Sequence, residues 1–248
     1  MHPTNSRKYR WSRHALAMIL CALLALVPQM AGAVAREGGT LSGMVRVYLS
    51  SIGTYQSLDI TIAGSYSVGG DTSRTLVRGE KITVSNQGGT LRMTRNGVSE
   101  LMGSSFKLRR HATSGENGVR IAQARTSANL YPGDIEFRAR SGAVQVIVHV
   151  YIEDYMRGVL PYEMSDSFPL EALKAQAVAA RTYTLKKMSA GASDYDVVDT
   201  TSDQTYRGTP SGNSNCVAAV NATKGIVGMY NGSYMASYYT ASNGGQTE

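Results

Sequence analysis

One glutamate of the chain stands in a setting suited to acid–base chemistry. Glu163 lies between Tyr162 and Met164, just after the turn that Pro161 marks and before a long helical segment. A general acid must hold its proton near neutral pH, and apolar surroundings favour that protonated form. A surface glutamate near a helix start fits the same pattern. The residues therefore indicate Glu163 as a candidate general acid and leave the surface interpretation open.

Other common reaction centres lack their signatures in this sequence. There is no phosphate-binding loop ending in Gly-Lys-Ser/Thr, and no HExxH, GxSxG or Cys-x-x-Cys motif. His149 falls in an alternating apolar run, which favours a packed strand residue over a ligand or base. No metal or cofactor is expected. A loose acidic stretch lacks the glycine and final glutamate of an EF-hand, which favours a solvated loop; it comprises Asp194, Asp196, Asp199 and Asp203.

The first half of the chain has the pattern of a β-rich region. Apolar and polar residues alternate in short runs, which are separated by Gly-rich turns such as Gly88-Gly89 and Asn96-Gly97. Residues 144–151 are nearly all apolar and β-branched, which predicts a strand buried on both faces. The alternating runs predict strands at 45–49, 57–62, 81–84, 90–93 and 134–138.

Helices are predicted after Tyr151. Residues 170–188 contain five alanines and neither Gly nor Pro, which predicts a helix with Ser167 as its cap and Pro169 in its first turn. A second helix is expected at 214–224, ending at Gly225. A hairpin turning at Asn231-Gly232 is expected to follow. The fold class is therefore α+β, with a β-rich N-terminal part followed by a mixed region of helices and strands.

The first 33 residues are predicted to be a cleaved export signal. Four basic residues precede an uninterrupted apolar run at 15–27, Pro28, and the small-x-small sequence Ala31-Gly32-Ala33. The run is short for a bilayer-spanning helix, and an uncleaved N-terminal membrane anchor is the alternative. Cleavage would leave a chain from about Val34 in the periplasm, the cell wall or the medium, with membrane contact only through the signal.

Without the predicted signal, the rest of the chain has a different net charge and cysteine content from the whole sequence. The whole chain of 248 residues carries +7, but residues 34–140 carry +6 and residues 141–248 carry −3. Nucleic acid is therefore not the expected partner, whereas the basic front could dock on anionic polymers. Cys216 is the one thiol left, so no internal disulfide is expected. A buried apolar position for Cys216 is favoured over a free reactive thiol.

Motifs in one order along the second half of the chain resemble a known family. The segment 151–164 contains Pro161-Tyr-Glu-Met164, and a second long segment covers 169–183. These segments resemble the stage II sporulation protein D and amidase enhancer LytB family (SpoIID/LytB). The chain as a whole resembles this family closely over residues 131–248 and loosely over residues 40–130. Further matching motifs are Tyr195-Asp196, Asp199-Thr-Thr, Gln204-Thr-Tyr206-Arg-Gly208, Ala222-Thr-Lys-Gly225, Tyr230-Asn-Gly232, Tyr238-Tyr239 and Ser242 to Glu248.

This resemblance implies a domain organisation. Residues 34–130 would form a β-rich, wall-docking part, and residues 131–248 a SpoIID-like catalytic core. The family domain normally continues for several more strands and helices, so the core is expected to be cut short at Glu248. Some members bind zinc through Cys and His near the Asp-Thr-Thr segment. This chain has Ser202-Asp203 there and Asn243 where many relatives carry Cys, so no zinc is expected.

The implied activity is that of a peptidoglycan lytic transglycosylase. Such a lyase cuts MurNAc–GlcNAc glycan strands, in sporulation members strands already stripped of stem peptides, to 1,6-anhydro-MurNAc ends. The family's catalytic glutamate matches Glu163, and a basic residue matches Arg181, which could bind the lactyl carboxylate or orient a carboxylate. One carboxylate suffices, because it protonates the glycosidic oxygen and then takes the proton of the sugar's own C6 hydroxyl, whereas hydrolases usually need two.

The alternative implied by the family is a non-catalytic cell-wall protein that enhances a partner N-acetylmuramoyl-L-alanine amidase. Glycan strands are the expected partner in either case, with a cell-wall amidase as a second. Gln204, Tyr206 and Tyr239 are candidates for hydrogen bonding and stacking with sugars, and a packing role for each tyrosine stays open. The Gly-rich C-terminal segment would border the groove; its candidates are Ser242, Gly244, Gly245, Thr247 and Glu248.

Overall fold

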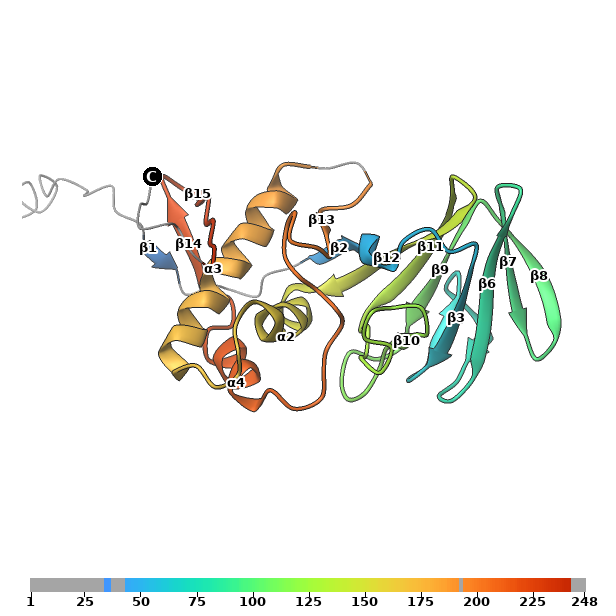
Figure 1. Ribbon diagram of the computed structural model, residues 1–248, viewed down its shortest axis with the longest axis horizontal. Helices are drawn as coiled ribbons and strands as arrows, with labels where there is room; N and C mark the ends of the chain where they lie inside the picture. The colour runs from blue at the N-terminus through green and yellow to red at the C-terminus, as the bar shows by residue number, and fades with distance from the viewer. Residues whose placement is uncertain (1–33, 37–42, 192–193, 242–248) are drawn as a thin grey trace, which may run out of the picture. The chain divides into compact units, whose positions relative to one another are not determined.

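Two β-sheets and three helices build the part of the chain that positions Glu163. A computed structural model describes residues 34–36, 43–191 and 194–241, which belong to one compact unit. The predicted α+β class is confirmed: strands dominate up to Tyr151 and helices follow (Figure 1).

The larger sheet has seven strands in the order β13-β2-β12-β11-β9-β4-β5. All neighbours are antiparallel except β13, which pairs with β2 in parallel. Strands from both sides of residue 130 therefore share one sheet. Its strands are β2 (Met44–Tyr48), β4 (Tyr66–Val68), β5 (Asp71–Leu76), β9 (Ser105–Arg110), β11 (Asp134–Arg140), β12 (Ala143–Tyr151) and β13 (Val197–Val198).

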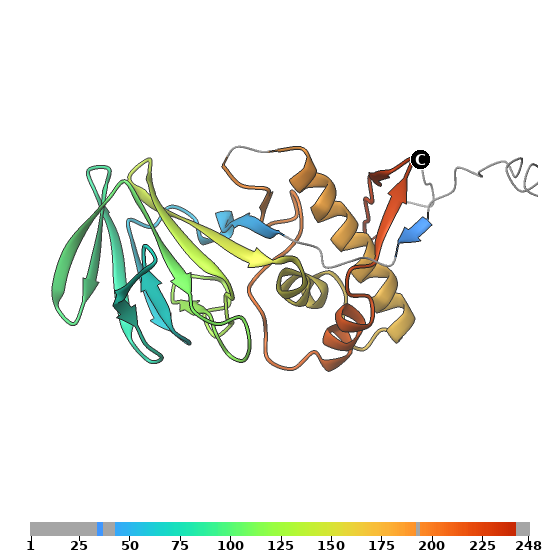
Figure 2. The ribbon, with the colours of Figure 1, turned by 180° about the vertical axis from the view of Figure 1, so that it is seen from behind.

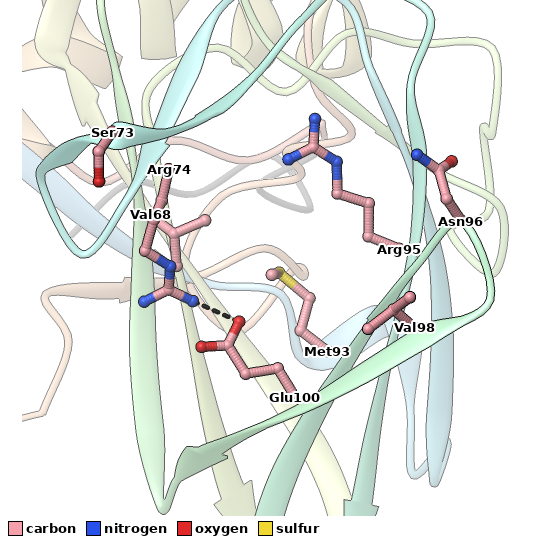
Figure 3. A pocket seen from close by; sticks show the side chains of 8 residues that line it. All are labelled: Val68, Ser73, Arg74, Met93, Arg95, Asn96, Val98 and Glu100. Carbon is pink, nitrogen blue, oxygen red and sulfur yellow. Dashed lines mark hydrogen bonds and ion pairs between the residues drawn. The ribbon is translucent and has the colours of Figure 1, made fainter.

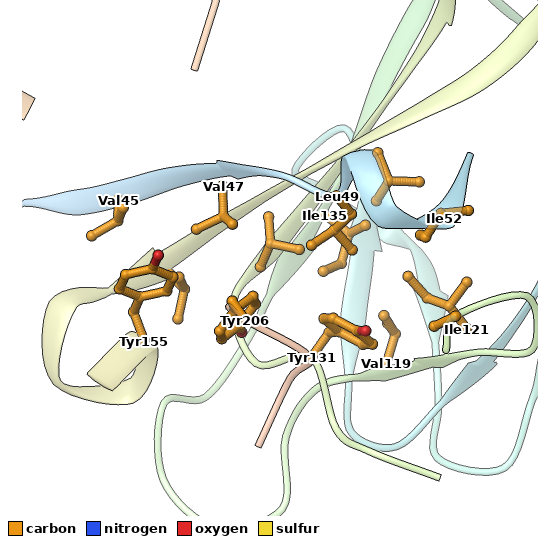
Figure 4. Packing of buried hydrophobic residues seen from close by; sticks show 14 of the residues in the cluster. Val45, Val47, Leu49, Ile52, Val119, Ile121, Tyr131, Ile135, Tyr155 and Tyr206 are labelled. Carbon is orange, nitrogen blue, oxygen red and sulfur yellow. The ribbon is translucent and has the colours of Figure 1, made fainter. Parts of the chain in front are cut away.

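A five-stranded sheet in the order β10-β3-β6-β7-β8 contacts the larger sheet, and apolar residues of both form one core (Figure 4). In β3, buried Leu58, Ile60 and Ile62 alternate with less buried residues, as the period of a strand requires. A 3₁₀ turn (Ser50–Ile52) follows β2. The strands of this sheet are β3 (Ser57–Ile62), β6 (Lys81–Gln87), β7 (Thr90–Arg95), β8 (Val98–Gly103) and β10 (Val119–Ile121).

The predicted strands are confirmed, including β12, which is buried on both faces for most of its length. The edge strand β8 lacks a sequence signal, because most of its side chains are exposed and its apolar residues do not alternate. The predicted hairpin is confirmed as well, with Asn231 and Gly232 at positive φ in the turn. It consists of β14 (Val227–Tyr230) and β15 (Ser233–Tyr234), and β14 also pairs with β1 (Val34–Arg36).

Three helices pack against one another and are seen together from both sides (Figure 1, Figure 2). They are α2 (Ile152–Glu163), α3 (Leu170–Ser189) and α4 (Ser214–Ala222). The two predicted helices are confirmed as α3 and α4. Ser167 does not cap α3, however, because Pro169 is the N-cap residue and no side-chain cap hydrogen bond forms. No helix among the described residues is long and apolar enough to cross a membrane.

The structure also predicts that the thiol of Cys216 is inert. Cys216 lies on α4 and is 1% exposed, as expected for a buried apolar residue. Burial, together with the neighbouring Asp166 carboxylate, raises the pKa of the thiol to about 12. Because the thiolate is the reactive form, we expect the folded Cys21→Ser variant to resist a maleimide at neutral pH and to react with one equivalent after unfolding. Rapid labelling of the folded variant would contradict this prediction.

Candidate active site around Glu163

Helix α2 places Glu163 at its C-terminal end. The helix follows β12 directly and contains Pro161 in its last turn. The turn predicted at Pro161 is therefore wrong: Glu163 ends a helix instead of preceding one, and residues 164–169 connect it to α3. Gly158 lets the helix pack closely on Tyr206, because a Cβ at this position would clash with the Tyr206 ring. A glycine is needed where the helix packs this closely on Tyr206.

One backbone N–H fixes the carboxylate of Glu163. The N–H of Thr205 donates to Oε1 over 2.7 Å, and the Glu163 residue is half-buried. Among the described residues, no donor reaches the other carboxylate oxygen, Oε2. Tyr239 lies close by: burial raises the pKa of its phenol, and the negative charge of Glu163 raises it further. Glu163 therefore sits where the end of α2, the loop through Thr205 and the chain at Tyr239 meet.

A polar cavity of about 230 Å³ is lined in part by Thr205 and is called the Thr205 cavity below. Two guanidinium groups line it, from the exposed Arg125 and the half-buried Arg207. Thr205 belongs to both places, because its backbone holds Glu163 while the residue lines the cavity. The cavity therefore adjoins the loop that holds Glu163. Its lining is Ser51, Arg125, Asp199, Thr200, Thr201, Thr205 and Arg207.

Asp199 is a carboxylate of this cavity, but its oxygens are occupied. It is 2% exposed and accepts hydrogen bonds from the backbone and hydroxyl of Ser51 (2.9 and 2.5 Å) and from the hydroxyl of Ser50 (3.0 Å). Burial raises the pKa of Asp199, and these hydrogen bonds partly offset the rise. Asp199 therefore holds the loop to the 3₁₀ turn after β2 and is not placed as a nucleophile.

The solvated acidic loop predicted around Asp199 is thus wrong. Asp196 pairs with Arg46 (2.7 Å), and Asp203 pairs with Lys187 (2.8 Å) and accepts the Tyr183 hydroxyl (2.7 Å). Only Asp194 keeps half of its side chain exposed. The apolar pair Val197-Val198 between the acids forms β13, which brings the stretch against β2.

Gln204 is a buried connector of the same loop. Its side-chain oxygen accepts the Thr184 hydroxyl (2.7 Å), and its amide donates to the Ala180 carbonyl (3.1 Å) and to the Tyr239 hydroxyl (2.9 Å). With 0% exposure, Gln204 holds the loop on α3 and orients Tyr239. Tyr239 is half-buried and lies near Glu163, which keeps it a candidate for sugar contact.

Tyr206 lies in the core. It is 0% exposed, its ring centroid is 4.9 Å from that of Tyr155 and 5.9 Å from that of Tyr131, and the three rings lie together beneath β2 (Figure 4). Of the two roles open to this tyrosine, packing is the one that its position allows. Its neighbour Arg207, in contrast, is half-buried and lines the Thr205 cavity.

Arg181 is also buried, with 0% exposure, and forms a bidentate ion pair with Glu153. Its Nε and Nη2 donate to the two Glu153 carboxylate oxygens over 3.1 and 2.8 Å. Nη1 and Nη2 donate further to backbone carbonyls of Ala177, Val220 and Ile226, and Glu153 accepts the N–H of Gly225. Arg181 thus joins α2, α3 and α4, and the solvated arginine considered as an alternative is excluded.

This ion pair lies away from Glu163. Glu153 and Glu163 are ten residues apart in one helix, and at 1.5 Å per residue their backbones lie about 15 Å apart along its axis. Of the roles expected for Arg181, orienting a carboxylate fits, but the carboxylate is that of Glu153. A buried arginine with all its nitrogens engaged is a positioning residue here.

A second cavity, of about 410 Å³, lies beside β4, β5, β7 and β8 (Figure 3). Its charged side chains are already paired. Arg74 pairs with Glu100 over 2.6 Å, and Arg95 pairs with Glu80 over 2.5 Å. It therefore offers a ligand fewer unsatisfied charges than the Thr205 cavity, despite its larger volume.

Comparison with known proteins identifies this region. Residues 140–230, which include α2, Glu163 and the Thr205 loop, match the family model for SpoIID, a stage II sporulation protein. This match, together with the relatives described next, supports membership of the SpoIID/LytB family for this region.

Two curated relatives share parts of the SpoIID region. An amidase enhancer of Bacillus subtilis is 52% identical over 93 residues, which cover 38% of this chain and 12% of the relative. An uncharacterized protein of Brachyspira hyodysenteriae is 41% identical over 120 residues, which cover 48% of this chain and 33% of the relative. The chain thus matches a third or less of the length of either relative.

Several predicted residues of the SpoIID site lie outside the described residues: Ser242, Gly244, Gly245, Thr247 and Glu248. Within the described ranges, no three His, Cys, Asp or Glu side chains gather into a metal-binding group. His149 accordingly pairs with Glu136 (2.6 Å) on the larger sheet, and burial lowers its pKa. Thr205, Arg125 and Arg207 were not foreseen as site residues, because nothing in their spacing predicts that the loop folds over the end of α2.

Proposed function

We propose that the SpoIID region cleaves peptidoglycan glycan strands as a lytic transglycosylase, with Glu163 as its acid and base. The family match and the amidase-enhancer relative support a cell-wall-associated role. One observation carries the finer proposal: among the described residues a single donor, from the loop that lines a polar cavity, holds Glu163, while Asp199 and Asp203 are saturated by protein contacts. A site with one available carboxylate suits a reaction that needs only one.

The reaction proceeds in two proton transfers. Protonated Glu163 gives its proton to the glycosidic oxygen as the bond from that oxygen to C1 of the muramic sugar breaks. The resulting carboxylate then takes the proton of the C6 hydroxyl as O6 bonds to C1. The products are a new hydroxyl end and a 1,6-anhydro end, and Glu163 regains its proton without consuming water. Thr205 keeps the carboxylate in one orientation during both transfers.

The proposal places the protein outside the cytoplasm, where its substrate lies, in agreement with the export signal predicted for residues 1–33. A membrane-anchored protein facing the wall would meet the same substrate. The basic excess of residues 34–140 would favour docking on anionic wall polymers.

Product chemistry tests this proposal. Incubation of the protein with peptide-free glycan strands in heavy-oxygen water is expected to yield anhydro-muramic ends without incorporated heavy oxygen, detected by mass spectrometry. A hydrolase would instead label each new reducing end, because its second carboxylate activates water. Labelled reducing ends would overturn the single-carboxylate mechanism.

A second function is favoured by the amidase enhancer of Bacillus subtilis, to which this chain is 52% identical over 93 residues. In this alternative, the SpoIID region binds glycan strands and stimulates a partner amidase without cleaving them. The absence of anhydro product, combined with faster release of stem peptides when the protein is added to a cell-wall amidase, would favour the enhancer.

A further inference from the structure

Asn129 is a buried polar residue in the connection between β10 and β11, ahead of the residues that match the SpoIID model. Its residue exposure is 6%, and its amide nitrogen Nδ2 donates to the Tyr162 hydroxyl oxygen (2.5 Å) and to the Arg207 carbonyl (2.8 Å). Because a carbonyl only accepts hydrogen bonds, the nitrogen of the amide and not its oxygen must face Arg207. One side-chain amide thus joins two segments that are far apart in the sequence.

These two segments carry the two parts of the Glu163 site. Tyr162 precedes Glu163 at the end of α2. Arg207 belongs to the loop in which the N–H of Thr205 donates to Oε1 of Glu163 over 2.7 Å. The guanidinium carbon of Arg207 also lies 5.5 Å from the centroid of the Tyr162 ring, a cation–π distance. The Asn129 amide therefore ties the end of the helix that carries the acid to the loop that orients it.

The backbone beside Asn129 is fixed against the same loop. Leu130 and Thr209 exchange two backbone hydrogen bonds, with N–H to carbonyl distances of 3.2 and 2.6 Å. Gly208 permits this close approach, because its φ is +71° and a Cβ there would lie 2.6 Å from the Leu130 carbonyl oxygen. Asn129 is therefore held in place by its own backbone as well as by its amide.

We propose that Asn129 is a positioning residue of the reaction, which keeps the Glu163 carboxylate in place through its two hydrogen-bond partners. This inference rests on the proposed acid–base role of Glu163. One carboxylate must meet first the glycosidic oxygen and then the C6 hydroxyl, and a displacement of about 1 Å can cost about 10²-fold in rate. Since Asn129 lies outside residues 140–230, the β-rich part of the chain contributes to the site.

The test removes the amide and follows both the reaction and the loop. Asn129→Leu in the full chain has a side chain of similar size that cannot donate to either partner. With peptide-free glycan strands, kcat is expected to fall about tenfold to a hundredfold. KM is expected to stay the same, because the variant displaces the acid without removing a group that binds substrate. Amide hydrogen exchange at Thr205, measured by NMR, is expected to become about tenfold faster, as for the loss of one hydrogen bond.

Asn86→Leu is the matched control. Asn86 is also buried, with 1% exposure, and its amide donates to a backbone carbonyl, that of Ala143 (2.8 Å). This hydrogen bond joins β6 to β12, so its loss is expected to lower stability as Asn129→Leu does. The control should nevertheless keep the parental kcat and the parental exchange at Thr205.

A second variant covers the case in which Asn129→Leu does not fold. Tyr162→Phe removes one hydroxyl from a half-buried ring and leaves the Asn129 amide its bond to the Arg207 carbonyl. It is expected to fold and to speed exchange at Thr205, by less than Asn129→Leu would. Parental exchange at Thr205 in Tyr162→Phe would then overturn the positioning role.

The outcomes separate this inference from the proposed function. A folded Asn129→Leu chain with the parental kcat and the parental exchange at Thr205 would overturn the positioning role. Equal changes in Asn86→Leu would also overturn it, since the effect would then come from lost stability. If the parent chain forms no anhydro ends, the proposed function fails, whereas the exchange measurement still decides whether Asn129 holds the Thr205 loop on Glu163.

Discussion

Replacing Glu163 with Gln is expected to slow the formation of anhydro-muramic ends by about 10²- to 10⁴-fold, the usual contribution of a general acid–base group. Gln has nearly the same shape and keeps an oxygen for the Thr205 N–H. It can neither give up a proton to the glycosidic oxygen nor take one from the C6 hydroxyl. The measurement is the initial rate of anhydro-end formation from peptide-free glycan strands, at a substrate concentration that saturates the enzyme.

A matched control is available on the next helix. Glu171 lies in the first turn of α3, its side chain is 82% exposed, and it pairs with Lys174. Glu171→Gln removes the same charge outside the lining of the Thr205 cavity and is expected to leave the rate unchanged. Cleavage by Glu163→Gln at the parental rate would remove Glu163 from the mechanism. Stimulation of a partner amidase by both the parent and Glu163→Gln, without product from either, would establish the enhancer function instead.

The sequence indicated Glu163 as the candidate acid, but it did not predict that Glu163 ends a helix. The motif Pro161 to Met164 resembles the family's catalytic segment, and the match to residues 140–230 supports that resemblance. Helix α2 was not predicted, because Gly158 and Pro161 both lower helix propensity. Tertiary packing overrides that propensity: Gly158 makes room for the Tyr206 ring, and Pro161 falls near the end of the helix.

Strands and long helices could be predicted because their sequence patterns are local. Alternation in β3 or the alanine-rich run of α3 is a local property, visible in a few residues. The partners of Arg181 and Gln204 are not local. Glu153 lies 28 residues from Arg181, and Tyr239 lies 35 residues from Gln204. Residue type alone could not distinguish a buried connector from a residue that touches substrate.

The surroundings of the charged residues in the Thr205 cavity could not be predicted from the sequence either. Asp199 stands in a stretch of acids that favours a solvated loop, whereas in the structure it is buried and accepts hydrogen bonds from two serines after β2. Arg125 and Arg207 are 82 residues apart in number and carry no common motif. Only the folding of the Thr205 loop over the end of α2 brings them to one cavity.

Arg181→Met is expected to lower the free energy of unfolding by about 3–5 kcal/mol, the cost of removing one partner from a buried ion pair. The variant leaves the Glu153 carboxylate without its guanidinium, and removes one donor from each of three backbone carbonyls. Denaturant unfolding measures the loss. Lys174→Met on the same helix is the control, expected to change stability by less than about 1 kcal/mol because its pair with Glu171 is exposed.

The double variant Glu153→Leu, Arg181→Met separates packing from chemistry. It removes both charges together, so part of the lost stability is expected to return. If Arg181 only positions α2, cleavage by the double variant should recover along with stability, because the backbone of Glu163 lies about 15 Å from that of Glu153 along α2. A double variant that is stable yet cleaves no glycan would assign Arg181 a direct part in catalysis and contradict the positioning role.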